Sequence, residues 1–200
     1  MHSAASVSNF KWEHYFFIVT HMEGDSFGCI ELTDSSEVIF FTDIFKGNKY
    51  ANIRKFIKTQ KYTGPTKQGI KLNGDQLQKI IDKLKTIPKE IHAIETQEVL
   101  SIPSYQNKHI KVNVDFYRGQ YWIDFRVYYE TEFFKGPTKK GVKIPFHYLM
   151  DTIRYLEEMN NHINCVSIET KNDRQEVIPE ESEEGEKIEG VPDEYKKYFE

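Results

Sequence analysis

The sequence predicts an α+β protein built from two tandem β-β-β(-β)-α repeats that pair within one chain. Over 38–84 against 110–156, an offset of 72 residues, 13 of 47 aligned positions are identical without a gap. Such a repeat indicates two copies of one structural unit. Period-two alternation in the aromatic-rich segments is typical of half-buried strands. An apolar stripe at i, i+4 and i+7 near the end of each repeat indicates a helix.

Each repeat opens with a segment rich in aromatic and β-branched residues, which favour strands. These strands are expected at 38–44 and 111–116, with one more before each at 27–32 and 97–102. A cationic residue and a glycine follow, and such a step indicates a hairpin turn. The turns are Lys46-Gly47 and Arg118-Gly119.

The strand after each turn alternates with a period of two, so it presents two different faces. In the second repeat one face carries Tyr121, Ile123, Phe125, Val127 and Tyr129, and the other carries Trp122, Asp124, Arg126 and Tyr128. In the first repeat the matching faces carry Lys49, Ala51, Ile53, Lys55 and Ile57, and Tyr50, Asn52, Arg54 and Phe56. Each repeated arginine therefore shares a face with an aromatic residue.

A Gly-Pro-Thr-Lys sequence comes next, at 64–67 and at 136–139. Gly-Pro is typical of a turn, so we expect a loop here, followed by short strands at 69–72 and 141–144. The lysines in and after this loop are suited to holding phosphates. A plain turn explains the Gly-Pro pair equally well.

A helix is expected to close each repeat. Asn73 is placed to cap the first helix, and Gln76 three residues later completes the pattern of a capping box. Leu77, Ile81 and Leu84 form its apolar stripe, and Leu149, Ile153 and Leu156 form that of the second helix. Pro145 suits the first turn of the second helix. Pro88 ends the first helical region.

Two such repeats are expected to pack as a pseudo-twofold pair, because one small sheet with one helix cannot bury both faces of the helix. We place repeat one at 38–90 and repeat two at 97–162. Residues 1–37 form an N-terminal aromatic segment with extra strands, and 173–200 form an acidic tail whose composition predicts disorder.

The net charge of −4 averages over three unlike segments. The net formal charge is −5 over 1–37, +8 over 38–171 and −7 over 173–200. A basic body between acidic ends is expected to attract polyanions through the body. The acidic tail is then a candidate either for autoinhibition of that surface or for docking a partner.

Other functional classes find little support. No apolar run approaches the roughly 18 residues of a membrane span, and no secretory signal is seen at the start. Two cysteines without a paired spacing predict neither a disulfide framework nor a zinc site. Catalytic motifs are absent, so we expect no catalytic residues, no metal, no cofactor and no small-molecule substrate. Asp43 and Asp115, the acids present in both repeats, are expected to cap turns.

The repeated residues are mainly Gly, Lys, Arg and aromatic residues, which suit backbone contacts and base stacking. An arginine beside an aromatic side chain on a sheet face combines a phosphate ligand with a stacking platform. Stacking of a base on an aromatic ring contributes roughly 1–3 kcal/mol and tolerates any sequence. The alternative is that these aromatic side chains simply pack the core.

The ordered motifs in both repeats resemble the single-stranded-DNA-binding core of the positive cofactor four family of transcriptional coactivators. In repeat one they are Phe45-Lys46-Gly47, Ile53-Arg54 and the stretch 64–73; in repeat two they are 115–119, 123–129 and 137–144, which follow the family pattern more closely. The resemblance implies curved antiparallel sheets, each followed by a helix, in a dimer whose halves the two repeats would supply. It also implies binding of single-stranded or melted DNA, with little sequence preference, in transcription or DNA maintenance.

Carried over position by position, the resemblance implies twelve nucleic-acid-binding residues. They are Phe45, Lys46, Arg54, Phe56 and Lys67 in repeat one, and Tyr117, Arg118, Arg126, Tyr128, Tyr129, Lys139 and Lys140 in repeat two. Two departures concern the binding surface. Asn48 and Gln120 stand where the family has a basic residue, and Ile57 stands where repeat two has Tyr129.

Three alternatives stay open from the sequence. The ligand is single-stranded DNA or RNA, since the purine-rich-element-binding (Pur) proteins also use tandem repeats of a related architecture. The alternative to a nucleic-acid-binding protein is a protein-interaction subunit that reuses the fold. Its partner would bind through residues 10–32 or the C-terminal tail. We expect an intracellular protein, nuclear if it is eukaryotic, without membrane contact.

Overall fold

A computed structural model of the protein describes residues 24–90, 94–131 and 135–166. Most of the expected N-terminal aromatic segment and the whole acidic tail at 173–200 lie outside these residues. The expectations about disorder, autoinhibition and docking of the tail therefore remain predictions.

The chain forms two units of the same design. Unit one contains β1 (Ser26–Thr33), β2 (Ser36–Phe45), β3 (Asn48–Lys58), β4 (Thr63–Leu72) and α2 (Gly74–Leu84). Unit two contains β5 (Gln97–Pro103), β6 (Lys108–Tyr117), β7 (Gln120–Glu130), β8 (Lys135–Pro145), the short 3-10 helix η2 (Phe146–Tyr148) and α3 (Leu149–Val166). The strands of each unit form one antiparallel sheet in chain order, here named sheet one (β1–β4) and sheet two (β5–β8). This arrangement confirms the predicted fold class, and β1 and β5 are the expected additional strands.

The two predicted hairpin turns are tight two-residue connections. Lys46 and Gly47 have φ of 49° and 79°, and Arg118 and Gly119 have φ of 52° and 81°. Two successive residues with positive φ define a type I′ turn, whose twist matches that of the flanking strands. Glycine adopts this conformation readily, whereas a lysine or arginine at the first position is strained.

The predicted loop at each Gly-Pro-Thr-Lys sequence is wrong, because these residues lie within strands β4 and β8. In sheet one, Phe56 pairs with Pro65 and Arg54 pairs with Gly69, so the three residues 66–68 face Lys55 alone. This is a β-bulge, and sheet two has the same shift between Arg126 and Tyr128. β4 and β8 are edge strands, and edge strands and bulges are where a sheet tolerates proline.

Helix α2 begins as the sequence predicts. The amide of Gln76 donates to the Asn73 side chain at 2.9 Å, and the amide of Asn73 donates to the Gln76 side chain at 3.1 Å. This is a complete capping box. Pro145 ends β8 and caps η2, so it lies just before the first helical turn of unit two.

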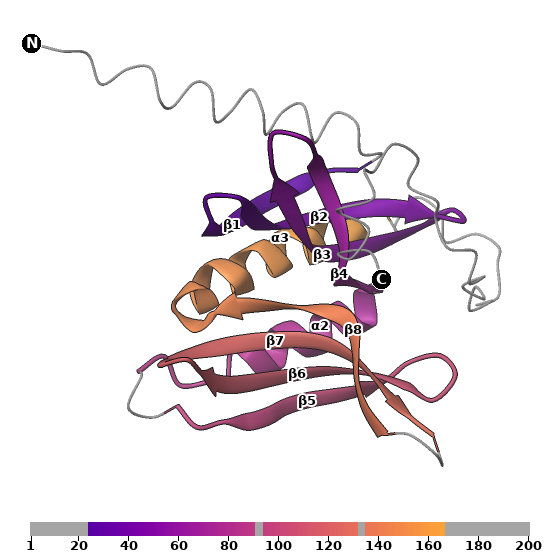
Figure 1. Ribbon diagram of the computed structural model, residues 1–200. Coiled ribbons are helices and arrows are strands. Elements are labelled where there is room, and N and C mark those ends of the chain that lie inside the picture. Colours follow the sequence, from indigo (N-terminus) through magenta and orange to yellow (C-terminus); the bar gives the residue numbers. More distant parts are fainter. Residues whose placement is uncertain (1–23, 91–93, 132–134, 167–200) are drawn as a thin grey trace, which may run out of the picture.

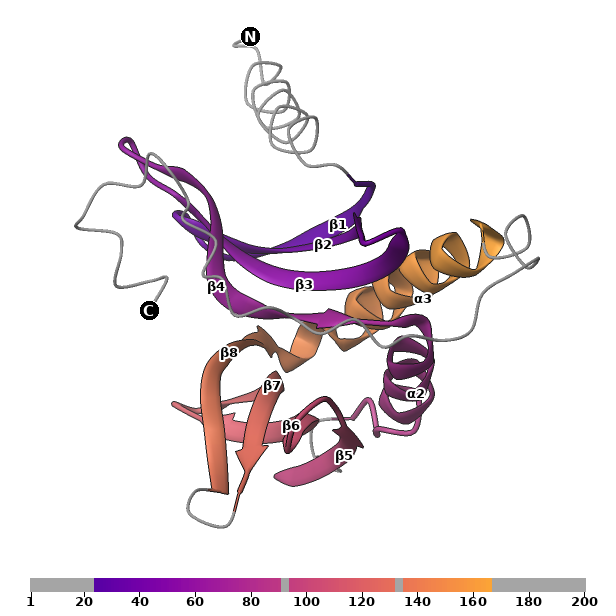
Figure 2. The ribbon, with the colours of Figure 1, turned by 90° about the vertical axis from the view of Figure 1, so that its right-hand side faces the viewer.

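The two helices lie between the two sheets, and each unit packs its helix partly on the other unit (Figures 1 and 2). Tyr155 of α3 packs on Phe40 of sheet one, with ring centroids 5.1 Å apart. Gly28 makes room for this ring, because a Cβ there would lie 2.1 Å from Tyr155. One continuous apolar cluster includes residues of both sheets and both helices, so the units share a single core.

Candidate nucleic-acid interface

A cleft of about 710 Å³ is lined by both units. Sheet one contributes the β1–β2 turn, Lys55 and the β4 bulge, and sheet two contributes one end of its outer face and the β8 bulge. The cationic lining residues are Lys55, Lys67, Arg126, Lys139, Lys140 and Lys143. No carboxylate lines the cleft among the described residues. We name this site the basic cleft.

Four of the six cations form no ion pair with another described residue. They are Lys55, Lys67, Lys139 and Lys140, and the last three are exposed. Lys67 belongs to the bulge of β4, whereas Lys139 and Lys140 belong to that of β8. The bulges therefore bring unpaired positive charge from both repeats to one cleft, where a polyanion would be held from two sides.

The same hydrogen bonds shape each bulge. The Thr66 hydroxyl donates to the Lys55 carbonyl at 2.8 Å and accepts from the Gln68 amide at 3.1 Å. In unit two, the Thr138 hydroxyl donates to the Val127 carbonyl at 2.8 Å and accepts from the Lys140 amide at 3.1 Å. The repeated threonine replaces the ladder bonds that the extra residues interrupt, which holds the lysines in place.

The repeated glycine after each bulge is explained by a close approach of two strands. A Cβ on Gly69 would lie 2.7 Å from the Ile53 carbonyl oxygen, and one on Gly141 would lie 2.6 Å from the Phe125 carbonyl oxygen. Contacts this short force the backbone to move. Any larger residue would therefore push the bulge away from the neighbouring strand.

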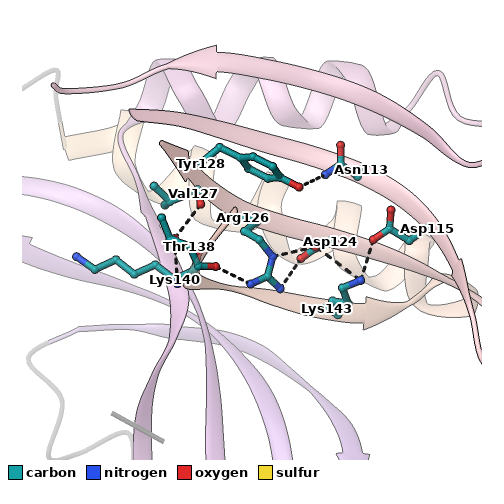
Figure 3. Close-up of polar contacts among 9 residues, drawn as sticks. All are labelled: Asn113, Asp115, Asp124, Arg126, Val127, Tyr128, Thr138, Lys140 and Lys143. Atoms are coloured by element: carbon teal, nitrogen blue, oxygen red, sulfur yellow. Dashed lines mark hydrogen bonds and ion pairs between the residues drawn. The ribbon is translucent and has the colours of Figure 1, made fainter. Parts of the chain in front are cut away.

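Arg126 joins a polar network on the outer face of sheet two (Figure 3). Its guanidinium binds both carboxylate oxygens of Asp124, at 3.0 and 3.1 Å, and donates to the Thr138 carbonyl at 3.0 Å. Asp124 is almost fully buried, and Lys143 lies 3.7 Å from its carboxylate. Arg126 therefore holds the bulge in place and neutralises a buried charge, which leaves it less available to a ligand.

Two acids expected to cap turns form ion pairs instead. Asp43 binds Lys71 at 2.9 Å, and Asp115 binds Lys143 at 2.8 Å. The pairs occupy equivalent positions on the two outer faces. Each joins the second strand of a sheet to the fourth across the strand between them.

Aromatic side chains lie at one end of the basic cleft. Trp122 and Tyr117 line it, and the Trp122 indole donates to the Tyr117 carbonyl at 3.2 Å. Tyr117 is 53% exposed, and the Arg118 guanidinium lies 5.2 Å from its ring centroid. Stacking surface and unpaired positive charge thus meet in one place.

Tyr128 and Tyr129 point to opposite faces of sheet two. Tyr128 lies on the outer face, where Asn113 donates to its hydroxyl at 3.4 Å and the Lys111 ammonium lies 5.1 Å from its ring centroid. A hydrogen bond to Glu98 raises the pKa of Lys111, which keeps this lysine charged. Tyr129 cannot share a stacking platform with Tyr128, because neighbouring residues of a strand alternate faces.

The outer face of sheet one differs in chemistry from that of sheet two. Phe56, the equivalent of Tyr128, has no exposed surface and packs with Ile39 and Phe41 in a second apolar cluster. The equivalents of Ile39 and Phe41 in sheet two are Lys111 and Asn113. A buried ring cannot stack on a base. In this structure Phe56 therefore fits the alternative that the aromatic side chains pack the core.

The first hairpin turn lies away from the basic cleft. Phe45 is 36% exposed, and ammonium groups of Lys46 and Lys71 lie 5.5 and 5.2 Å from its ring centroid. Arg54 lies on the outer face of sheet one and donates to the Thr66 carbonyl at 2.9 Å. Of the twelve predicted residues, the cleft brings together Lys67, Tyr117, Arg126, Lys139 and Lys140.

Comparisons with known proteins gave one family match, over part of the chain, and one similar solved structure. A family model described as "Transcriptional Coactivator p15 (PC4)" matches residues 40–83, from β2 into α2. A solved structure, "Crystal Structure of WHY3 from Arabidopsis thaliana", is similar with a TM-score of 0.38 and 10% identity, over 72% of this chain and 90% of that chain. A search of curated protein sequences found no match.

The family match lies in repeat one, whereas the sequence motifs predicted that repeat two follows the family pattern more closely. The matched stretch contains the type I′ turn, the bulge and the capping box of unit one. In the equivalent stretch of unit two, the described residues 112–131 and 135–155 form the corresponding strands, turn and bulge.

Three cationic or aromatic residues that line the cleft were not among the predicted ligands. Lys55 lies on the core-facing side of β3, as strand alternation predicts, but alternation gave no sign that this side opens into a cleft at Lys55. Trp122 was correctly placed on the face of β7 that carries Arg126. That shared face, together with its position near the turn, was the signal that could have marked Trp122 as a ligand. Lys143 was noted only as a repeated lysine following the Gly-Pro-Thr-Lys sequence.

No cluster of three or more His, Cys, Asp or Glu side chains among the described residues could hold a metal ion. No helix in the described part of the chain is long and apolar enough to cross a membrane.

Proposed function

We propose that the protein binds single-stranded nucleic acid in the basic cleft and along the outer face of sheet two. The observation that carries the proposal is the convergence of four unpaired lysines from both repeats beside Trp122 and Tyr117. The match to the PC4 coactivator family over 40–83 supports the same function. It extends the proposal to a coactivator-like role in transcription, exercised by binding rather than by catalysis.

The proposed mechanism combines two physical effects. Lys55, Lys67, Lys139 and Lys140 neutralise phosphates and release counterions, which gives affinity without sequence preference. Trp122 and Tyr117 stack on bases, which requires the bases to be unpaired. A duplex hides its bases, so single strands are preferred.

The proposed ligand path is asymmetric between the repeats. On sheet two it runs from Tyr117 and Arg118 past Trp122 toward Tyr128. Sheet one takes part through Lys55 and Lys67, and its outer face, closed by Phe56, is left out. Arg54 and Arg126 act as positioning residues, since each holds a bulge.

The test is fluorescence anisotropy with a labelled strand of about 20 nucleotides, as DNA, as RNA and as duplex, between about 50 and 300 mM salt. The variant Lys67→Ala/Lys139→Ala/Lys140→Ala should weaken single-strand binding and reduce the slope of log K against log salt by about 2, near 0.7 per lysine. The DNA and RNA arms separate the two single-stranded ligands.

The matched control is Lys79→Ala/Lys83→Ala/Lys89→Ala, which removes the same charge from exposed positions on and after α2. It should keep most of the affinity and most of the slope. Equal losses in the two triple variants would mean that net charge, and not the cleft, governs binding. Tighter binding of the duplex than of the single strand would contradict the stacking mechanism.

A further inference from the structure

Unit two carries a second, largely apolar groove at the opposite side of its hairpin turn. The groove has a volume of about 430 Å³ and is lined by the end of β6, the start of β7, η2 and the first turn of α3. Phe146 and Leu149 form its floor and belong to the shared core, whereas Phe116 and Met150 are 55% and 50% exposed. The floor is therefore continuous with the interface that joins the two units.

The equivalent place in unit one is filled. Helix α3 continues for ten residues past Leu156, the equivalent of the last residue of α2. We name residues 157–166 the α3 extension. The ammonium of Lys49 lies 2.8 Å from His162, and Asn160 donates to Gln78 at 2.7 Å. Ile163 faces Gly74, where a Cβ would lie 3.7 Å from its Cγ2.

The residues that hold the α3 extension have equivalents in the open groove. Lys49, Gln78 and Gly74 correspond, at the offset of 72, to Tyr121, Met150 and Phe146, and all three line the groove of unit two. Helix α2 ends at Leu84, and Pro88 follows shortly after, so no helical extension of α2 fills this groove. The three positions are more apolar than in unit one, so an apolar helix face fits them.

The charge of the groove restricts the partner. Lys89 is exposed at its rim and is the only described Lys, Arg, Asp or Glu that lines it. An acidic side chain on the bound helix would pair with Lys89. The apolar floor, which continues the interface between the units, suits the apolar face of a helix. The single lysine at the rim suits an acidic side chain on that helix.

We propose that this groove binds an amphipathic helix of a partner protein. The helix presents apolar side chains one turn apart, as Met159 and Ile163 are in the α3 extension, and an acidic side chain to Lys89. This site is separate from the basic cleft and does not depend on the nucleic-acid function.

The probe is a fluorescent peptide of residues 157–166 with Asn160→Leu, His162→Leu and Cys165→Ser, extended by alanine-rich turns that favour a helix. The two leucines would meet Met150 and Tyr121. Anisotropy with the full chain should show saturable binding, weakened about tenfold by Met150→Lys, which places a charge at the centre of the contact. A peptide with Met159→Lys and Ile163→Lys should not bind.

The protein control is Ile44→Lys. Ile44 is 59% exposed and is the equivalent of Phe116, but it lies beside the place that the α3 extension fills. This variant should bind the peptide normally, and circular dichroism should show that both variants fold. Absence of saturable binding, or equal binding by Met150→Lys and the parent chain, would overturn the proposal.

Sedimentation of the chain alone separates a partner from a second copy. A concentration-dependent dimer that Met150→Lys abolishes would assign the groove to self-association and would also overturn the proposal. A monomer supports it. Single-strand affinity should be the same in Met150→Lys as in the parent chain, so failure of one proposal leaves the other standing.

Discussion

Arg126 and Thr138 are joined by a hydrogen bond of 3.0 Å, from Nη1 of the guanidinium to the main-chain carbonyl oxygen. Arg54 and Thr66 are joined in the same way at 2.9 Å in the other unit. In both units the arginine lies on the strand before the bulge and the threonine lies in the bulge. The repeated arginine therefore keeps the bulge, and the lysines on it, in position.

The variant Arg126→Ala should lower the free energy of unfolding by about 3 kcal/mol, because it leaves the buried Asp124 carboxylate without its close partner. The matched variant Arg54→Ala should lower it by about 1 kcal/mol, because the residue in the place of Asp124 is the neutral Asn52. Urea-induced unfolding measures both values. Similar losses in the two variants would contradict the assigned role of Asp124.

The variant Gly141→Ala should destabilise the protein by about 1–3 kcal/mol, since the added methyl group overlaps the Phe125 carbonyl oxygen. Single-strand affinity should fall as well, because the bulge that carries Lys139 and Lys140 must shift. Gly74→Ala is the control, as its Cβ meets nothing closer than 3.6 Å. Thermal unfolding and anisotropy report the two effects, and an unchanged Gly141→Ala protein would rule out the close approach.

The variant Arg118→Asn should raise the free energy of unfolding by about 1 kcal/mol, because asparagine tolerates the left-handed conformation better than arginine does. It should weaken single-strand binding, since one cation beside Tyr117 is lost. Lys46→Asn should give the same stabilisation with retained affinity, because its turn lies away from the basic cleft. Loss of affinity in both variants would mean that both turns contact the ligand.

The variant Trp122→Leu should weaken single-strand binding by about 1–3 kcal/mol through loss of a stacking surface. The slope of log K against log salt should stay unchanged, because no charge is removed. Phe45→Leu serves as the control outside the cleft. A changed slope, or a loss of affinity in the control that matches the loss in Trp122→Leu, would count against stacking at Trp122.

Burial raises the pKa of Tyr62 above the ordinary tyrosine value, and its hydroxyl donates to the Pro65 carbonyl at 2.9 Å. A raised pKa in the folded state means a contribution to stability that is complete below the ordinary pKa and is lost as pH rises through the raised one. The difference in phenolate absorbance between the parent chain and Tyr62→Phe isolates this titration. Ionisation at the ordinary tyrosine pKa would contradict the prediction.

Local elements were the most predictable part of the fold. The strands, the two type I′ turns and the Asn73–Gln76 capping box depend on neighbouring residues. The repeat at 72 residues supplied two instances of each strand and of the turn, whereas the capping box occurs in unit one alone. The Gly-Pro-Thr-Lys segment was misread because Gly-Pro favours a turn locally. Its strand pairing depends on Thr66 in the bulge, on Arg54 of the neighbouring strand and on their equivalents in unit two. Their hydrogen bonds form only once the sheet assembles.

The candidate site was predicted in type and only partly in membership. Cationic and aromatic residues were recognised, but the strand period could not tell that Phe56 is buried with Ile39 and Phe41. Nor could it place Lys55, from a core-facing position, in a cleft with lysines of the other unit. Burial and assembly of residues from different sheets depend on how the sheets pack.

The sequence by itself determined the duplicated architecture, the order of strands and helices, and the kind of chemistry that the protein offers, because these follow from local periodicity and residue type. Tertiary structure alone decided which repeat exposes its outer face, which lysines share the basic cleft, and which groove the α3 extension fills. The reason is that the two repeats form one core. Each surface is therefore set by the packing of one unit on the other, which no local pattern encodes.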